Sequence, residues 1–88
     1  MAHAEIYTTA ICPYCVAVKN FLKTRGFDYS EVRIDREPGK LQEMLERSAG
    51  RRSVPQVFIN GAHVGGYDDL VAADRSGRLQ ALIEGASQ

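Results

Sequence analysis

The chain contains two cysteines, Cys12 and Cys15, separated only by a proline and a tyrosine. Two thiols at this spacing can form and break one disulfide bond, and a thiolate can attack the disulfide of another molecule. Because the chain has no other cysteine, the pair cannot be half of a four-cysteine structural zinc site. The pattern therefore predicts thiol–disulfide redox chemistry.

A metal site is the alternative use of the two cysteines. It would need the two histidines of the chain, His3 and His63, as further ligands. These histidines lie on either side of the cysteine pair in the sequence and match no zinc-finger spacing. We therefore expect no bound metal.

The composition predicts one small domain covering residues 1–88. Of the 88 residues, 44% are hydrophobic and 25% are charged, which leaves no room for a second core. Eleven Lys and Arg balance eleven Asp and Glu, so no overall field concentrates nucleic acid or holds the chain to an anionic membrane. We expect a monomer without nucleic-acid or membrane partners.

The N-terminal segment favours a cytoplasmic location. Residues 1–11 lack the basic start and long apolar stretch of a secretory signal, and no window is long enough to span a bilayer. In the reducing cytoplasm, a lone cysteine pair is more often catalytic than a permanent structural disulfide.

A strand, a helix and a second strand are predicted around the cysteines. Residues 5–8 have the β-branched and aromatic content of a strand. From Pro13 to about Arg25, apolar residues recur at helical spacing, with Val16 near the apolar face, and Gly26 is placed to end the helix. Residues 29–34 alternate in polarity like a strand. Such a unit has parallel strands and a right-handed crossover.

A second helix is expected to start at Asp35, Glu37 and Pro38 and to run to about Ala49. Acidic residues suit the first turn of a helix, and proline loses nothing where the amide has no partner.

A hairpin and two short helices complete the chain. Residues 57–64 predict two strands joined at Asn60-Gly61, a pair that readily takes the positive φ angles of a type I′ turn. Two short helices then follow, separated near Ser76-Gly77. The order β-α-β-α-β-β-α-α predicts an α/β fold, with helices flanking a mixed four-stranded sheet. This is the thioredoxin-like architecture, in which a C-x-x-C motif near a βαβ unit is a redox motif.

Three motifs resemble those of the dithiol glutaredoxins, the class I members with a C-P-Y-C active site. They are C-P-Y-C at residues 12–15, S-V-P at residues 53–55 and G-G-Y-D-D at residues 65–69, in the order and spacing of that family. The resemblance spans essentially the whole chain. It implies reduction of protein disulfides and glutathione mixed disulfides, with glutathione as co-substrate and no permanently bound cofactor. An NADPH-dependent glutathione reductase would regenerate the glutathione.

The predicted helix assigns different roles to the two cysteines. An ordinary cysteine has a pKa of about 8.5 and is mostly protonated at neutral pH. Cys12 is expected at the helix N-terminus, where unpaired amides and the positive end of the dipole favour its thiolate. Pro13 suits the first helical position. We therefore predict that Cys12 is the nucleophile and that Cys15, one turn further in, is the resolving thiol.

The resemblance also implies a substrate-binding role for Val54 and Pro55. In the glutaredoxins this proline is cis and lies against the active-site cysteines, so Val54 would offer its backbone amide and carbonyl to the cysteinyl part of glutathione. The sequence alone would favour the alternative, in which Pro55 merely begins a strand in trans, because cis is the minority isomer.

The same family position implies that the segment from Gly66 to Asp69 holds the γ-glutamyl end of glutathione. The helix-start amides of Asp68 and Asp69 would bind its carboxylate, and the Asp69 side chain would take its ammonium. Tyr67 opens that helix, and Tyr14 would pack on the ligand beside the thiols. The two aspartates could also serve only as helix caps.

A cation is needed for the glycine carboxylate of glutathione. Arg51 is predicted by family position, with Arg52 beside it, although an arginine in a loop is more often simply solvated. Many glutaredoxins carry a lysine shortly before the first cysteine, where this chain has Thr9. Lys19 is expected to face away along the helix and to be a poor replacement.

Two other functions share parts of this pattern. A thioredoxin-type reductase fed directly by a flavoprotein would have the fold and the dithiol but no glutathione site. A carrier that bridges an iron–sulfur cluster through Cys12 and glutathione would also fit the fold, although Pro13 makes the loop more rigid than is usual in cluster-binding relatives.

Overall fold

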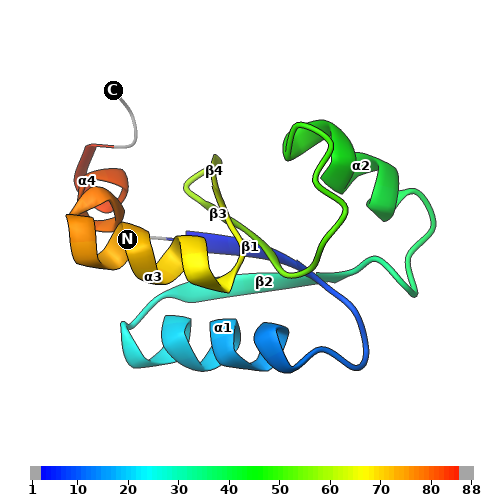
Figure 1. The fold of residues 1–88 in the computed structure, drawn as a ribbon, viewed down its shortest axis with the longest axis horizontal. Coiled ribbons are helices and arrows are strands. Elements are labelled where there is room, and N and C mark those ends of the chain that lie inside the picture. Colours follow the sequence, from blue (N-terminus) through cyan, green and yellow to red (C-terminus); the bar gives the residue numbers. More distant parts are fainter. Residues whose placement is uncertain (1–2, 86–88) are drawn as a thin grey trace.

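Four strands form one mixed sheet in the order β2-β1-β3-β4 (Figure 1). The computed structural model describes residues 3–85. The strands are β1 (His3–Thr8), β2 (Asp28–Arg33), β3 (Gln56–Ile59) and β4 (Ala62–Gly65). β1 pairs in parallel with β2 and antiparallel with β3, and β3 pairs antiparallel with β4. The predicted α/β fold with a mixed four-stranded sheet is therefore confirmed.

Helices cover both faces of the sheet (Figure 1). They are α1 (Pro13–Thr24), α2 (Lys40–Arg47), α3 (Tyr67–Ser76) and α4 (Arg78–Gly85). Because side chains of a strand alternate between its faces, Ile6 packs with Val18 of α1 and Leu70 of α3, whereas Tyr7 packs with Met44 of α2. Two apolar clusters, one on each side of the sheet, thus hold the layers together.

The turns follow the local sequence signals closely. Asn60 and Gly61 have φ angles of 49° and 85°, as the predicted type I′ hairpin turn requires. Gly77 has a φ of 86° and separates α3 from α4. Gly26 follows α1 with a φ of 80°, which places the end of that helix where it was predicted.

Two details of the helices were predicted wrongly. α2 begins at Lys40 after Gly39, so residues 35–39 form turns and not a first helical turn. The carboxylate of Asp35 binds Arg33 instead, at 2.8 Å, because that cation is held beside it at the end of β2. The helical spacing predicts Val16 near the apolar face of α1, but its side chain is 55% exposed. Among the described residues, no helix combines the length and apolar character that crossing a membrane requires.

Candidate active site

Cys12 is the N-cap residue of α1, and Pro13 occupies the first helical position. The backbone N–H of Cys15 donates to Cys12 Sγ at 3.1 Å. The two sulfurs form a disulfide in this structure. Cys15 is buried with 2% exposure, whereas Cys12 is only half-buried. The helix-start amide therefore faces the sulfur that is also the more accessible of the two.

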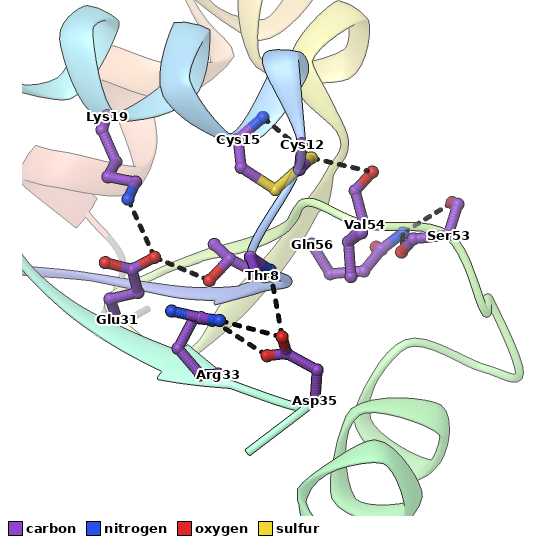
Figure 2. The surroundings of a disulfide bond; sticks show 11 residues. Thr8, Cys12, Cys15, Lys19, Glu31, Arg33, Asp35, Ser53, Val54 and Gln56 are labelled. Carbon is purple, nitrogen blue, oxygen red and sulfur yellow. Dashed lines mark hydrogen bonds and ion pairs between the residues drawn. A yellow bond between two sulfur atoms is a disulfide. The ribbon is translucent and has the colours of Figure 1, made fainter. Parts of the chain in front are cut away.

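The loop before β3 lies against this disulfide (Figure 2). Cys12 Sγ is 4.0 Å from the carbonyl oxygen of Val54. The Val54–Pro55 peptide bond is cis, as the resemblance implied. This arrangement leaves backbone groups of an irregular segment beside the reactive sulfur, where an extended substrate can pair with them.

A pocket of about 190 Å³ opens beside the loop. Residues from α1, from the segment before β3 and from the start of α3 line it: Tyr14, Arg51, Ser53, Val54, Pro55, Gly66, Tyr67, Asp68 and Asp69. The structure thus brings together all the residues that the sequence nominated for ligand binding. Ser53 is the one further lining residue.

The N-terminus of α3 forms the polar end of this pocket. Asp69 Oδ2 accepts a hydrogen bond from the N–H of Gly66 at 2.9 Å and another from Arg51 Nη2 at 3.1 Å. These contacts, first that of the Gly66 amide and then that of Arg51, hold the pKa of Asp69 below its usual value despite partial burial. Gly65 has a φ of 120°, and a side chain there would come within 2.8 Å of Arg51 Nη1. Gly65 therefore gives the ion pair its space, because a side chain at this position would collide with both Arg51 and Asp69.

Arg51 lies at the Asp69 end of the pocket in this structure. Both side chains of the pair are more than two-fifths exposed, so the ion pair is weak and exchangeable. Its predicted role at the glycine carboxylate of glutathione stays a prediction.

Two tyrosines line the pocket, and exposed apolar side chains lie next to Cys12 in the sequence. The rings of Tyr14 on α1 and Tyr67 on α3 lie 6.0 Å apart between centroids. Tyr14 is 61% exposed and Ile11 is 93% exposed, so the chain next to Cys12 presents apolar surface to solvent.

The cation nearest to Cys15 along α1 is already paired. Lys19 Nζ lies 2.9 Å from Glu31 Oε2, and the same carboxylate oxygen accepts the hydroxyl of Thr8 at 2.7 Å (Figure 2). Lys19 is thus bound to β2, in agreement with the expectation that it does not replace the lysine missing at Thr9.

Sequence reasoning missed one residue of this neighbourhood, Gln56. It directly follows Pro55 and is completely buried, with its side-chain amide bonded to Ser53 and its oxygen to His63. A glutamine inside the apolar run of β3 is the available signal, because a buried amide needs specific partners. No group of three or more His, Cys, Asp or Glu side chains placed to hold a metal ion exists within residues 3–85.

Comparisons with known proteins agree on one family. The family model described as Glutaredoxin matches residues 4–64. Glutaredoxin 3 of Escherichia coli strain K12 is 46% identical over 84 residues, which cover 96% of this chain and 100% of that protein. The solution structure of glutaredoxin from Brucella melitensis has a TM-score of 0.78 at 40% identity, covering 96% of this chain and 90% of that one. The crystal structure of the buckwheat glutaredoxin–glutathione complex has a TM-score of 0.77 at 32% identity, covering 90% of this chain and 74% of that one.

Proposed function

The chain belongs to the glutaredoxin family of thiol–disulfide oxidoreductases, and from that premise we propose that it uses glutathione to reduce glutathione mixed disulfides and protein disulfides. The observation that carries this proposal is the pocket beside Cys12. Val54 lines this pocket together with Gly66, Asp68 and Asp69 from the start of α3. An extended peptide with a free amino and carboxyl group fits these groups, and the structural relative from buckwheat binds glutathione.

The chemistry divides between the two sulfurs. The Cys12 thiolate, stabilised by the amide at 3.1 Å, attacks the glutathione sulfur of a mixed disulfide and expels the other thiolate. A second glutathione thiolate then attacks that sulfur, which releases oxidised glutathione and restores Cys12. With a protein disulfide, Cys12 first forms a mixed disulfide with the substrate. Cys15 then attacks Cys12 and expels the reduced substrate, which leaves the disulfide seen here. Two glutathione molecules reduce it again.

The protein acts in this proposal as a monomer in the cytoplasm, without nucleic-acid or membrane partners. Glutathione is consumed as a co-substrate, and NADPH-dependent glutathione reductase returns it to the reduced form. No further cofactor is needed.

A coupled assay tests the proposal. A glutathionylated peptide, NADPH, glutathione and glutathione reductase should give steady NADPH oxidation that depends on this protein. The same mixture with thioredoxin reductase in place of glutathione and glutathione reductase should give none. Turnover in that second mixture would instead identify a reductase fed directly by a flavoprotein.

Anaerobic reconstitution with iron and sulfide tests the other alternative. It should leave a colourless monomer, and a brown, glutathione-dependent dimer would identify the cluster carrier.

A further inference from the structure

The side chain of Gln56 binds the loop before β3. We call the part of this loop formed by residues 53–55 the substrate loop. Its side chain folds back from β3, and Nε2 donates to the carbonyl oxygen of Ser53 at 3.0 Å and to its hydroxyl oxygen at 3.2 Å (Figure 2). On the other side of the amide, Gln56 Oε1 lies 2.7 Å from Nε2 of His63 on β4. All of the hydrogen-bonding atoms of this buried amide are therefore used.

These contacts determine the proton position on His63. Turning the Gln56 amide over would place its oxygen against the Ser53 carbonyl, where two acceptors would repel each other. The amide oxygen therefore faces His63, and Nε2 of the imidazole carries the proton that it donates. The ring packs on Phe58 with centroids 4.9 Å apart, and burial, followed by the charge of Arg51, lowers the pKa of His63 below its usual value. Arg47, Asp69 and Arg78 are the other charges that act on it.

The Ser53–Val54 peptide is the group that this chain of contacts fixes. A trans peptide unit is planar, with its C=O and N–H on opposite sides. When the Ser53 carbonyl points to Gln56, the N–H of Val54 must point away from it. Val54 lines the pocket, and its own carbonyl oxygen lies 4.0 Å from Cys12 Sγ.

We propose that Gln56 and His63 are positioning residues for substrate binding, which orient the Ser53–Val54 peptide so that the Val54 backbone pairs with the cysteinyl part of a glutathione mixed disulfide. This inference rests on the proposed function, since the ligand is glutathione in both. Neither side chain touches the reacting sulfur atoms. Their loss weakens binding of the glutathionyl group and leaves the intrinsic reactivity of Cys12 intact.

Four variants test the inference, and in each of them KM is compared with kcat. Gln56→Leu places an apolar side chain at this buried position and removes the bonds to Ser53. KM for a glutathionylated peptide should therefore rise about tenfold, while kcat stays within about twofold. His63→Phe removes the N–H that donates to Gln56 and leaves the bonds to Ser53 in place, so KM for the same peptide should rise about threefold. His63→Gln restores an N–H donor and should return KM toward the wild-type value. His3→Phe, at the other histidine, which is bonded to Ser30, should change nothing.

Two further readouts separate positioning from general damage. Iodoacetamide reacts with the Cys12 thiolate without binding to the substrate loop. The rate at which it alkylates Cys12 in the reduced protein should therefore be the same in wild type and Gln56→Leu. The Val54 amide resonance in an ¹⁵N spectrum should move in Gln56→Leu and stay in place in His3→Phe. Unchanged KM in Gln56→Leu, a parallel loss of alkylation rate, or a His63→Gln variant that behaves like His63→Phe would each overturn the inference. If the wild type does not turn over glutathione mixed disulfides, the proposed function fails, and the Val54 resonance alone still decides whether Gln56 fixes the loop.

Discussion

The guanidinium of Arg51 lies 3.1 Å from the Asp69 carboxylate oxygen that also accepts the Gly66 amide. The carboxylate predicted to receive the ammonium group of glutathione is therefore already paired in the free protein. Because this ion pair is exposed and worth at most about 1 kcal/mol, an arriving ammonium group can displace Arg51 at little cost. In the proposed glutathione complex, the released guanidinium would then meet the glycine carboxylate of the same ligand.

Arg51→Ala should raise KM for a glutathionylated peptide by about tenfold, the loss expected for one charge-assisted contact at a partly exposed site. The same variant should be nearly neutral with the mixed disulfide of γ-glutamylcysteine, which lacks the glycine carboxylate. Steady-state kinetics with both substrates would test this, with Arg52→Ala as the matched control. An equal penalty on the two substrates would show that Arg51 serves the γ-glutamyl end only.

The two cysteine variants should separate the two reactions. Cys15→Ser is expected to retain reduction of a glutathionylated peptide, because that cycle needs only Cys12 and free glutathione. Its reduction of a protein disulfide should fall by roughly tenfold or more, because no second thiol releases the trapped substrate. Cys12→Ser should lose both activities. The role assignment fails if Cys12→Ser remains active in either assay.

Much of the site was predictable because each of its motifs is local. A proline at the first helical position fixes where α1 starts, and the start of the helix decides which cysteine sulfur faces the amides. The glycine pair before Tyr67 marks the bend into α3 in the same way. The hairpin turn at residues 60–61 needs no information from outside those two residues.

The features that sequence reasoning missed depend on specific side-chain contacts, which the residue types alone do not reveal. Asp35 and Glu37 have the composition of a helix start, but both side chains bind Arg33, and α2 begins later at Lys40. The bond between Gln56 and His63 requires the register of β3 against β4, which includes an irregularity between Val57 and Phe58. The first outcome depends on which partner the two acidic side chains take, and the second depends on the pairing of two strands.

A lysine at position 9 should make Cys12 more reactive. Thr9 precedes Cys12 by three residues in the loop after β1, and Lys19 is bound to Glu31 at 2.9 Å. A cation near the sulfur favours the thiolate over the thiol, so Thr9→Lys should speed alkylation of reduced Cys12 at pH 6 by about threefold. Thr24→Lys at the far end of α1 is the control with the same added charge. Equal acceleration in both variants would contradict a local effect.

The hydroxyl of Tyr7 should stabilise the packing of α2 on the sheet. It donates to Glu43 and accepts from Arg47 Nη1 at 2.8 Å, and its pKa is raised, mainly by burial. Tyr7→Phe leaves both partners with one contact fewer and should lower the free energy of unfolding by about 1–2 kcal/mol.

Urea unfolding of the reduced protein measures the effect of Tyr7→Phe, and activity should be unchanged. The control is Tyr29→Phe on β2, since the Tyr29 hydroxyl forms no hydrogen bond with other residues in the described range 3–85. If both variants lose the same stability, the network around Tyr7 contributes nothing specific.

The carboxylate of Asp35 should stabilise the protein in a pH-dependent manner. It accepts two bonds from Arg33, at 2.9 and 2.8 Å, and one from the N–H of Ala10 in the loop before Cys12, at 3.1 Å. The Arg33 contact is the main cause that lowers the pKa of Asp35 from 3.8 to about 2. Because the folded pKa lies below the unfolded one, this stabilisation is complete above about pH 4 and is lost as the pH falls toward 2.

Asp35→Asn cannot carry the charge at any pH. The difference in unfolding free energy between wild type and Asp35→Asn should therefore be largest at pH 5 and should shrink between pH 4 and pH 2, following the shift of the Asp35 pKa from 3.8 to about 2. Urea unfolding at several pH values measures it, and the carboxyl carbon resonance of Asp35 should titrate with a midpoint of about 2. Asp28→Asn, at the start of β2, is the control. A difference that stays constant across this pH range would show that the Asp35 charge does not hold the loop before Cys12.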